Sequence, residues 1–471
     1  MRKTKIICTI GPASENEETF TSMCKAGLNV ARLNFSHGSH EEHQKKIDMI
    51  KKVRGELALP IAIMLDTKGP EYRIRTFKNG KAVLQDGGTF TFTTDDVEGD
   101  ENIVSVNYKG LVDELKVGAT ILVNNGLLIF KVRELSGHNA ICDIVTGGVI
   151  SDRKSMNFPN HVLKGDYLSE QDKDDLLFGI RNDVDFVAAS FVSNKSDVQA
   201  LRTFLDENGG EDIEIIAKIE NQSGVDHIDE ICEIADGIMV ARGDLGVEVP
   251  FVELPAIQKK LIHKCRLLGK RVITATEMLE SMINNPRPTR AEISDVANAV
   301  YDGTSAVMLS GESAAGKYPV EAVRSMAEIC EFTEKNIDYV KRFHTADYVI
   351  KDMINAISHA SCAMAIDVKA KCIVINSLSG RTARLVSRFR CPVDIVGITT
   401  REKVWRKLNL CWGVTPVKTE EYSNTEVLFY NAVRVAKKTL NLTAGDNIVL
   451  TAGQITGTSG NSNTIRVEVA P

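Results

Sequence analysis

Residues 213–246 read IEIIAKIENQSGVDHIDEICEIADGIMVARGDLG, and this stretch decides the fold predicted for the chain. Two short apolar runs, Ile213–Ala217 and Gly237–Ala241, have the length and β-branched content of buried parallel strands. Between them, Ser223–Ala235 carries apolar residues at helical spacing. The stretch is therefore predicted to be one strand–helix–strand unit of a parallel α/β fold.

Ionisable residues follow both predicted strands: Lys218 and Glu220 follow the first, and Arg242 and Asp244 follow the second. Because the carboxyl ends of parallel strands meet at one face, we expect these four side chains to share a cleft. Two carboxylates suit Mg²⁺ or Mn²⁺, and a lysine beside the metal suits a phosphoryl group or a developing enolate. An ordinary buried ion pair between neighbouring strands is the alternative, and this stretch alone leaves it open.

Length and composition limit the class of protein. A chain of 471 residues, 43% hydrophobic and 25% charged, has room for two or three globular domains. A net charge of −6 argues against a general nucleic-acid binder, and no apolar run is long enough to span a membrane. The first apolar run is too short for a signal peptide, and the ten cysteines form no C-x-x-C pair. We expect a cytoplasmic protein with no nucleic-acid or membrane partner.

Eight strand–helix units are predicted, three before residue 70 and five after residue 169. This count predicts a (β/α)₈ TIM barrel over residues 1–70 and 169–345, with an open doubly wound sheet as the competing architecture. A polar group follows every strand, which favours the closed barrel. The predicted strands are Lys5–Ile10, Leu28–Leu33, Ile61–Leu65, Val184–Ala189, Ile213–Ala217, Gly237–Ala241, Arg271–Ala275 and Ser305–Leu309.

Two further domains are predicted. Residues 71–168 show short alternating runs separated by glycine turns, which predicts a small all-β domain, a β-barrel, inserted into the α/β series. Residues 346–471 are predicted to form a separate C-terminal α/β domain. Within it, residues 377–382 open a helix whose free N–H groups and dipole favour a phosphate. An N-capped helix without a ligand is the alternative interpretation of that loop.

Six motifs stand out along the chain: LNFSHG at 33–38, MLDTKGPE at 64–71, AKIEN at 217–221, VARGDLGVE at 240–248, NPRPTRAEISDVANAVYDG at 285–303 and MLSGE at 308–312. Together they resemble pyruvate kinase, of the bacterial type that has no extra C-terminal domain. They occur in the order and spacing of that family, and the similarity covers essentially the whole chain. The resemblance implies phosphoryl transfer from phosphoenolpyruvate to ADP, giving pyruvate and ATP, in the final step of glycolysis.

The resemblance also implies a role for each matching residue. Lys218, Arg32 and Thr276 would be catalytic, and the same three with Gly243 and Asp244 would bind the substrate. The inserted domain would close over the nucleotide as a lid and exclude water. The remaining implied ligands are Glu220 and Asp244 for Mg²⁺ (or Mn²⁺), Asn34, Ser36, Asp66 and Thr67 for K⁺, Asn34, His37, Arg73 and Lys154 for the nucleotide, and Ser377, Ser379, Gly380, Arg381 and Thr382, with residues 457–460, for a sugar-phosphate or AMP effector of a homotetramer.

Departures from the family pattern leave some assignments open. Arg73 fits the nucleotide clamp by direct register, but Arg75 fits if two residues were inserted. Two asparagines, Asn124 and Asn125, stand where a pair of aspartates is common, so the lid contacts are open. Glu277 replaces the usual glutamine after Thr276 and adds a negative charge near an anion site.

Two other functions compete with the kinase. The first is another Mg²⁺-dependent phosphoenolpyruvate or pyruvate barrel, such as a carboligase or aldolase, which would not need an ADP-clamping lid. The second is a catalytically idle homologue, against which the intact Lys218, Glu220 and Asp244 argue.

Overall fold

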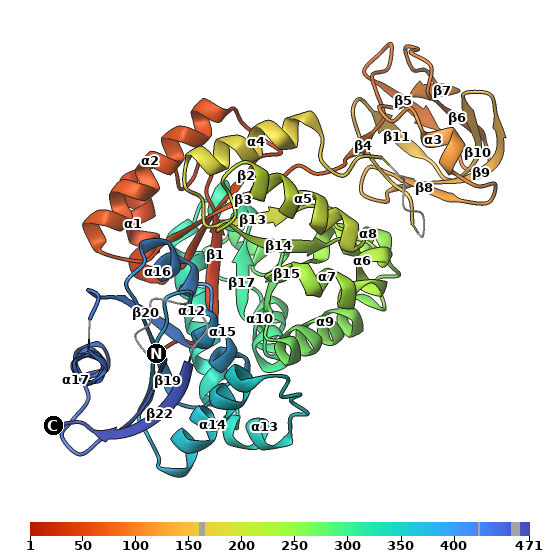
Figure 1. The fold of residues 1–471 in the computed structure, drawn as a ribbon. Helices are drawn as coiled ribbons and strands as arrows, with labels where there is room; N and C mark the ends of the chain where they lie inside the picture. Colours follow the sequence, from red (N-terminus) through yellow and green to blue (C-terminus); the bar gives the residue numbers. More distant parts are fainter. Residues whose placement is uncertain (160–164, 423, 454–461) are drawn as a thin grey trace.

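A closed barrel of eight parallel strands forms the centre of the molecule (Figure 1). The computed structural model describes residues 1–159, 165–422, 424–453 and 462–471. The strands follow the order β1-β17-β16-β15-β14-β13-β3-β2, which confirms the predicted barrel and excludes the open sheet. Their bounds are β1 (Lys5–Thr9), β2 (Val30–Asn34), β3 (Ala62–Asp66), β13 (Phe186–Ala189), β14 (Glu214–Ile219), β15 (Gly237–Ala241), β16 (Arg271–Ala275) and β17 (Ala306–Leu309).

Helices surround the barrel and bury its outer apolar side chains. The helix predicted over 223–235 is instead two helices, because His227 leaves the helical conformation with ψ 17° and its Nδ1 lies 2.9 Å from the Ser223 carbonyl oxygen. None of the described helices is long and apolar enough to cross a membrane. The helices are α1 (Glu17–Ala26), α2 (His40–Leu57), α4 (Glu170–Arg181), α5 (Lys195–Glu207), α6 (Gln222–Asp226), α7 (Ile228–Ile234), α8 (Arg242–Glu248), α9 (Leu254–Leu268), η1 (Glu280–Ile283), α10 (Arg290–Asp302), α11 (Gly311–Ala314), α12 (Pro319–Lys335) and α13 (Tyr339–Thr345).

The insertion between β3 and α4 is all-β apart from one short helix, as predicted. A seven-stranded sheet, in the order β4-β12-β8-β9-β10-β6-β7, and a two-stranded sheet, β11-β5, enclose one core that contains Phe90, Phe92 and Phe130. The elements are β4 (Tyr72–Arg73), β5 (Lys81–Leu84), β6 (Thr89–Thr93), β7 (Ile103–Ser105), α3 (Leu111–Glu114), β8 (Thr120–Val123), β9 (Leu128–Ser136), β10 (Asn139–Thr146), β11 (Gly148–Ser151) and β12 (Ser155–Asn157).

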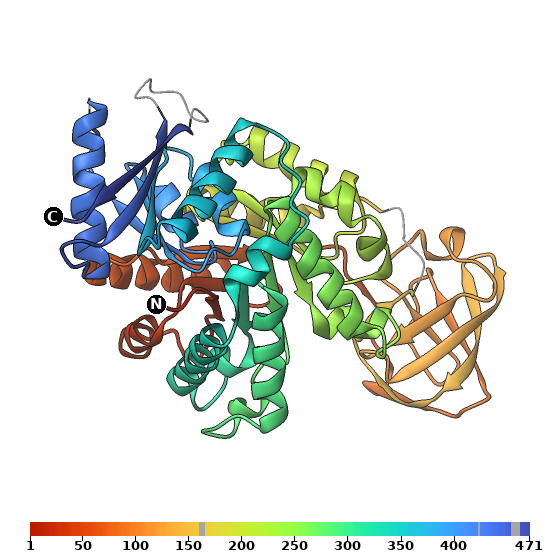
Figure 2. The ribbon, with the colours of Figure 1, turned by 90° about the horizontal axis from the view of Figure 1, so that it is seen from below.

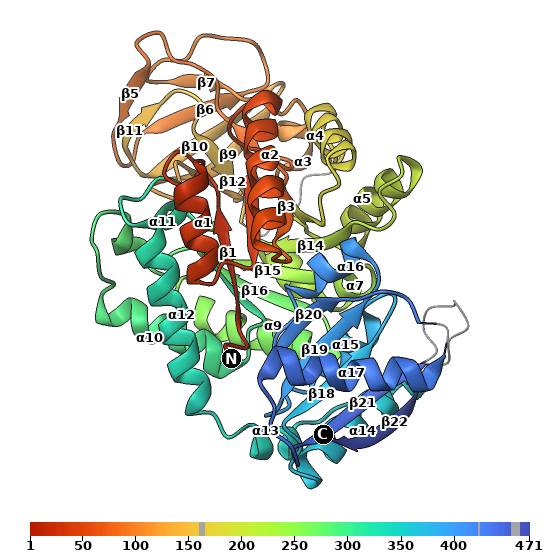
Figure 3. The same cartoon turned by 90° about the vertical axis from the view of Figure 1, so that its left-hand side faces the viewer.

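The C-terminal α/β unit has a five-stranded sheet in the order β20-β19-β18-β21-β22, of which only β22 is antiparallel to its neighbour. Helices α14, α15 and α16 pack on one face of this sheet, and α17 covers the other (Figure 3). The elements are α14 (Met353–Asp367), β18 (Cys372–Asn376), α15 (Arg381–Arg388), β19 (Asp394–Thr399), α16 (Glu402–Leu408), β20 (Val414–Lys418), α17 (Thr425–Leu440), β21 (Asn447–Gly453) and β22 (Ser462–Val469).

The insertion and the C-terminal unit lie at opposite ends of the molecule, with the barrel between them (Figure 2). The segment after α16 closes the amino end of the barrel, where Leu410 joins the apolar side chains of the barrel interior. Asn409 Nδ2 donates to the carbonyl oxygens of Asn29 and Pro60, which precede β2 and β3. The carboxyl end of the barrel is thereby left as the open face, next to the insertion.

Candidate active site

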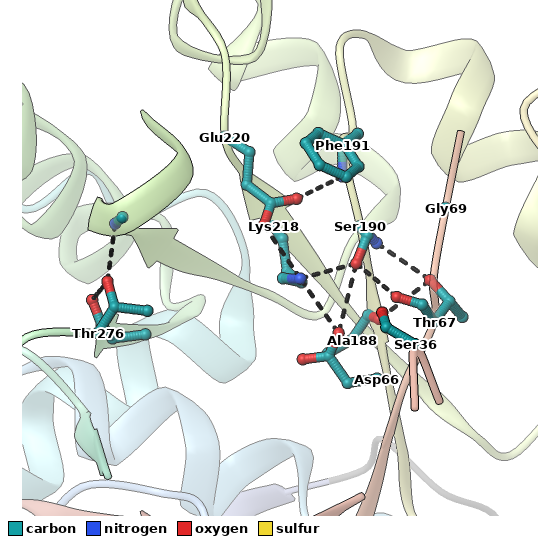
Figure 4. Close-up of polar contacts among 12 residues, drawn as sticks. Ser36, Asp66, Thr67, Gly69, Ala188, Ser190, Phe191, Lys218, Glu220 and Thr276 are labelled. Carbon is teal, nitrogen blue, oxygen red and sulfur yellow. Dashed lines mark hydrogen bonds and ion pairs between the residues drawn. The ribbon is translucent and has the colours of Figure 1, made fainter. Parts of the chain in front are cut away.

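Lys218 and Glu220 lie at the carboxyl end of β14 and face the same way, because residues two apart on a strand share a face. Lys218 Nζ lies 3.0 Å from Glu220 Oε1, 3.1 Å from Asp66 Oδ1 and 2.7 Å from Ser190 Oγ (Figure 4). Glu220 is fully buried and Lys218 is 8% exposed. The lysine thus lies between two carboxylates and a hydroxyl at the mouth of the barrel.

The charges in this cluster perturb one another. Burial alone would lower the pKa of Lys218, but the carboxylates of Asp66 and Glu220 outweigh burial and raise it well above its usual value. Burial raises the pKa of Glu220 to about 7, and the nearby Asp244 charge adds to this shift, while Lys218 opposes it. Lys218 is therefore a permanent cation, and Glu220 is a carboxylate that would gain from a second positive charge.

A divalent cation fits this need. Glu220 Oε1 faces Lys218 Nζ at 3.0 Å but accepts no hydrogen bond from the described residues, whereas Oε2 accepts the backbone N–H of Phe191 at 2.6 Å. Asp244, exposed in the first turn of α8, is close enough to raise the pKa of Glu220. Among the described residues, no group of three or more His, Cys, Asp or Glu could hold a metal alone. A hard cation here would share Glu220 and Asp244 with water and substrate oxygens, as Mg²⁺ commonly does.

Arg32 supplies a second buried cation from strand β2, the neighbour of the strand β3 that carries Asp66. Its Nε lies 2.6 Å from Asp66 Oδ2, and a terminal nitrogen donates to Thr9 Oγ1 at 2.8 Å. Burial would raise the pKa of Asp66, but Arg32 and Lys218 outweigh it and lower that pKa. Asp66 therefore orients two cations at the same mouth, which suits a site for an anionic phosphate.

Ser190 is a site residue that sequence reasoning did not identify. Its hydroxyl accepts from Lys218 and donates to the Thr67 carbonyl oxygen at 2.6 Å, while its N–H donates to Thr67 Oγ1 at 3.1 Å. The next residue, Phe191, adopts φ 54°, which aims its N–H at Glu220. Ser190 directly follows the predicted strand Val184–Ala189, so its position after a strand was the available signal.

Thr276 follows β16, which only β15 separates from β14 in the barrel (Figure 4). It adopts φ 68°, an outlier for a β-branched residue, and Glu277 follows with φ 54°. Thr276 Oγ1 accepts the N–H of Gly243 at 2.8 Å and donates to the Ala275 carbonyl oxygen at 2.6 Å. The strained backbone thus joins Thr276 to the first turn of α8, which carries Asp244.

Arg242 is not part of the Lys218 cluster, so the expectation that four side chains share one cleft is wrong for this residue. A terminal nitrogen lies 2.5 Å from Asp295 Oδ2, and Nε donates to the Thr276 carbonyl oxygen at 3.1 Å. Its guanidinium therefore fastens the strained loop to α10.

The four oxygen-bearing residues expected at a K⁺ site come together. Asn34 and Asp66 are paired neighbours at the ends of β2 and β3, and Thr67 directly follows Asp66. Asn34 Oδ1 accepts the N–H of Ser36 at 3.2 Å. His37, by contrast, is exposed, and its carbonyl oxygen contacts His43 Nε2 at 2.9 Å.

A cleft of about 480 Å³ lies between the insertion and the barrel mouth. Arg73 and Asn125 line it from the insertion, and Asp244 lines it from the barrel. Arg75 instead pairs with the exposed Asp96 at 3.0 Å and does not line the cleft. Lys154 is half-buried beside the lining residue Ser155 but does not line it either. The geometry therefore favours Arg73 over Arg75 as a nucleotide contact.

Residues 377–380 form the loop before α15, and Arg381 and Thr382 open that helix, as the phosphate-loop hypothesis requires. Gly380 precedes the helix with φ 74°, and the exposed Arg381 lies 3.4 Å from Asp352 Oδ2. The Thr382 hydroxyl is buried and hydrogen-bonded to Ser462 Oγ at 2.6 Å, so it is already satisfied. Ser377 donates its N–H to the Ile398 carbonyl oxygen, and Ser379 Oγ accepts the N–H of Arg381 at 3.5 Å. Residues 457–460 lie outside the described residues.

An α/β barrel with buried cations and paired carboxylates at its mouth, facing a cleft under an inserted domain, defines an enzyme that handles an anionic substrate. Comparison with known proteins identifies the enzyme family within this class. The family model for the pyruvate kinase barrel domain matches residues 1–323, and the model for the pyruvate kinase alpha/beta domain matches residues 355–468.

Individual relatives agree over the whole chain. A pyruvate kinase of Clostridium acetobutylicum is 46% identical over 471 residues and is covered completely in both directions. A pyruvate kinase of Staphylococcus epidermidis is 47% identical over all of this chain and 80% of its own length. The crystal structure of a pyruvate kinase from Cryptosporidium parvum has a TM-score of 0.95 and 38% identity, covering 100% of this chain and 96% of its own. The chain belongs to the pyruvate kinase family and is a phosphotransferase.

Proposed function

We propose that this enzyme transfers the phosphoryl group of phosphoenolpyruvate to ADP, giving pyruvate and ATP, as the final step of glycolysis. The observation that carries the proposal is the position of Lys218 between Asp66, Ser190 and Glu220 at the mouth of the barrel. It is supported by the pyruvate kinase relatives that match the chain from end to end.

The residues divide the work between binding and charge stabilisation. Lys218 and Arg32 would bind the phosphoryl oxygens and stabilise charge as the group moves, which supplies most of the catalysis in such transfers. The Thr276 hydroxyl, with the N–H groups of Gly243 and Asp244, would hold the substrate carboxylate. Ser310, whose buried hydroxyl has no partner among the described residues, would join Thr276 in delivering a proton to the enolate.

Metal ions would complete the site. Glu220 and Asp244 would hold Mg²⁺, or Mn²⁺, which would supply positive charge beside the phosphoryl and enolate oxygens. A K⁺ ion would be held by oxygen atoms at the carboxyl ends of the neighbouring strands β2 and β3. The four residues that offer them are Asn34, Ser36, Asp66 and Thr67. Glu71 follows Gly69-Pro70, the sequence variant associated with K⁺ dependence in this family, and this supports the monovalent site.

The nucleotide would lie in the cleft under the inserted domain, near Arg73, with Asn34, His37 and Lys154 as the other expected contacts. Closure of the insertion over ADP would exclude water that could intercept the phosphoryl group. We also propose the domain boundaries 1–70 and 169–345, 71–168, and 346–471, which the separate hydrophobic cores support.

A coupled assay with phosphoenolpyruvate, ADP and Mg²⁺, with and without K⁺, tests the reaction. We expect turnover that requires ADP and Mg²⁺ and that falls at least about tenfold when K⁺ is replaced by an organic cation. Turnover without ADP would support the aldolase or carboligase alternative. No turnover with any of these components would support the idle homologue.

Regulation and assembly are proposed on the same basis. The loop formed by Ser377, Ser379, Gly380, Arg381 and Thr382 would bind a sugar phosphate or AMP in a cytoplasmic homotetramer. Titration of fructose 1,6-bisphosphate, ribose 5-phosphate and AMP at subsaturating phosphoenolpyruvate tests the effector. An activity that none of the three compounds changes would refute the proposed allosteric regulation. Light scattering in solution measures the oligomeric state and tests the homotetramer.

A further inference from the structure

Tyr167 lies in the segment that returns from the insertion to α4, and its side chain reaches the mouth of the barrel. Its ring is partly buried against the barrel core, and its hydroxyl donates to the carbonyl oxygen of Ser190 at 2.8 Å. Burial, followed by the charge of Asp197, raises the pKa of Tyr167 well above its usual range. The hydroxyl therefore stays protonated and remains a hydrogen-bond donor near neutral pH.

The carbonyl group of Ser190 belongs to the same peptide unit as the N–H group of Phe191. That N–H donates to Glu220 Oε2 at 2.6 Å (Figure 4). Because a peptide unit is planar and trans, its C=O and N–H groups point in opposite directions and turn together. Tyr167 and Glu220 therefore hold the two ends of one rigid unit.

This peptide unit has a conformation that the backbone alone does not favour. Phe191 has φ 54°, in the left-handed region that bulky residues rarely occupy. A rotation of the peptide unit would return φ to the ordinary negative range and turn the N–H away from Glu220. The same rotation would take the carbonyl oxygen away from the Tyr167 hydroxyl, so this hydrogen bond opposes it.

The other polar groups of Ser190 do not fix this peptide unit. The Ser190 hydroxyl contacts Lys218 and the Thr67 carbonyl oxygen, and the Ser190 N–H donates to Thr67 Oγ1 at 3.1 Å. These contacts hold the side chain and the preceding peptide unit. Among the described residues, only the Tyr167 hydroxyl donates to the Ser190 carbonyl oxygen.

Glu220 depends on this peptide unit for its orientation. The bond from Phe191 holds Oε2, and Oε1 then faces Lys218 Nζ at 3.0 Å. The same bond lowers the pKa of Glu220 and so opposes the effect of burial. A carboxylate that is kept ionised and held in one direction is well suited to a divalent cation.

A purely structural interpretation is that the Tyr167 hydroxyl only fastens the insertion to the barrel. The Tyr108 hydroxyl has such a role, since it donates to Glu114 Oε1 at 2.6 Å within the insertion. Tyr167 differs because its acceptor shares a peptide unit with the N–H that binds Glu220. Loss of the Tyr167 hydroxyl would therefore be felt at the carboxylate.

We propose that Tyr167 is a positioning residue, whose hydroxyl fixes the Ser190–Phe191 peptide unit and thereby the carboxylate of Glu220. The inference rests on the proposed function, in which Glu220 holds Mg²⁺ or Mn²⁺. Tyr167 acts through the peptide unit and not by touching the metal.

Titration of Mn²⁺ on the full chain without substrates tests the inference, with free Mn²⁺ followed by electron paramagnetic resonance. Tyr167→Phe removes only the hydroxyl and should weaken Mn²⁺ binding about fivefold, the equivalent of one lost hydrogen bond. Tyr108→Phe is the matched control and should bind as the native chain does, because Tyr108 also loses a hydrogen bond but does not line the cleft. Equal binding by the Tyr167→Phe and native chains would overturn the inference and leave the metal site intact. No Mn²⁺ binding by the native chain would refute the metal site and the inference with it.

Hydrogen–deuterium exchange measures the peptide unit directly. The fragment that contains Phe191 should exchange about threefold faster or more in Tyr167→Phe, whereas the fragment that covers α12 should not change. Unchanged exchange at Phe191 would refute the route through the peptide unit.

Steady-state kinetics separates positioning from nucleotide binding. In Tyr167→Phe, kcat should fall about fivefold while the KM for ADP stays the same, because phenylalanine keeps the ring that lines the cleft. A higher KM for ADP with native Mn²⁺ affinity would overturn the inference and make Tyr167 a nucleotide contact.

Discussion

Lys218 Nζ lies 3.1 Å from Asp66 Oδ1, although 152 positions of sequence separate the two residues. Strand β13 lies between their strands in the barrel, and Ser190, which directly follows it, contacts both side chains through its hydroxyl. The contact therefore spans three consecutive strand ends. A single disturbed strand would displace the cation from the site, so the closed barrel itself fixes the position of the charge.

Lys218→Met should lower kcat by about 100- to 1,000-fold, the usual loss when one group that stabilises transition-state charge is removed. The substitution keeps much of the side-chain volume but leaves Asp66 and Glu220 without their shared cation. The coupled phosphoenolpyruvate assay measures the loss, with circular dichroism to check folding. Lys173→Met is the control, since the Lys173 side chain on α4 is half-exposed and pairs with Glu170 of its own helix. A Lys218→Met enzyme with more than about a tenth of native kcat would refute the role of this lysine.

Ser190→Ala should lower kcat about tenfold through the position of Lys218. It removes the hydroxyl that accepts from Lys218 and donates to Asp66, and losing a hydrogen bond to a charged group typically costs about 1.5 kcal/mol or more. The KM for ADP should stay unchanged, because Ser190 does not line the nucleotide cleft. Steady-state kinetics for both substrates separates these effects, with the exposed Ser196→Ala as control. An equal rise of the KM for ADP and the KM for phosphoenolpyruvate, without a change in kcat, would argue against a role of Ser190 in positioning Lys218.

Arg73→Gln and Arg75→Gln form a matched pair for the nucleotide site. Arg73 lines the cleft, so its loss should raise the KM for ADP by about tenfold or more and leave the KM for phosphoenolpyruvate unchanged. Arg75 pairs with Asp96 outside the cleft, so its loss should change neither constant. The reverse outcome would show that the register is shifted by two residues, as the alternative alignment requires.

Glu248 should make the stability of the enzyme depend on pH. Burial raises its pKa in the folded state to about 7, and it accepts hydrogen bonds from Asn157 and Phe158 of the insertion. The unfolded value is near 4.5, so the folded state binds more protons between these limits. The contribution of protonated Glu248 to the free energy of unfolding is fully present below pH 4.5 and is lost as the pH rises to about 7.

Glu248→Gln keeps the shape of that side chain but cannot ionise. Relative to the native chain, the variant should gain about 2 to 3 kcal/mol in free energy of unfolding between pH 5 and pH 8, and show little gain below pH 4.5. Urea unfolding at several pH values measures the difference. Asp206→Asn is the control, since Asp206 is on α5, away from the insertion. A constant difference across the range would refute the assignment.

The strands could be predicted from sequence because buried parallel strands are short continuous apolar runs, and the ends of β14 and β15 gave Lys218, Glu220 and Asp244 directly. Ser190 could not be recognised, since a serine after a strand is ordinary until its neighbours across the barrel are known. The break at His227 was missed because apolar periodicity continues through it while a local side-chain contact ends the helix. Likewise, the choice between Arg73 and Arg75 depended on the pairing of β4 with β12, a long-range contact.

Leu410 belongs to the C-terminal unit by sequence but to the barrel by packing. A fragment ending before it would expose the lower layer of the barrel to solvent and lose the amide contacts made by Asn409. The catalytic half of this enzyme is therefore not a detachable module. A shift of the C-terminal segment would therefore be transmitted through Leu410 and Asn409 to the barrel strands that bear the active-site residues.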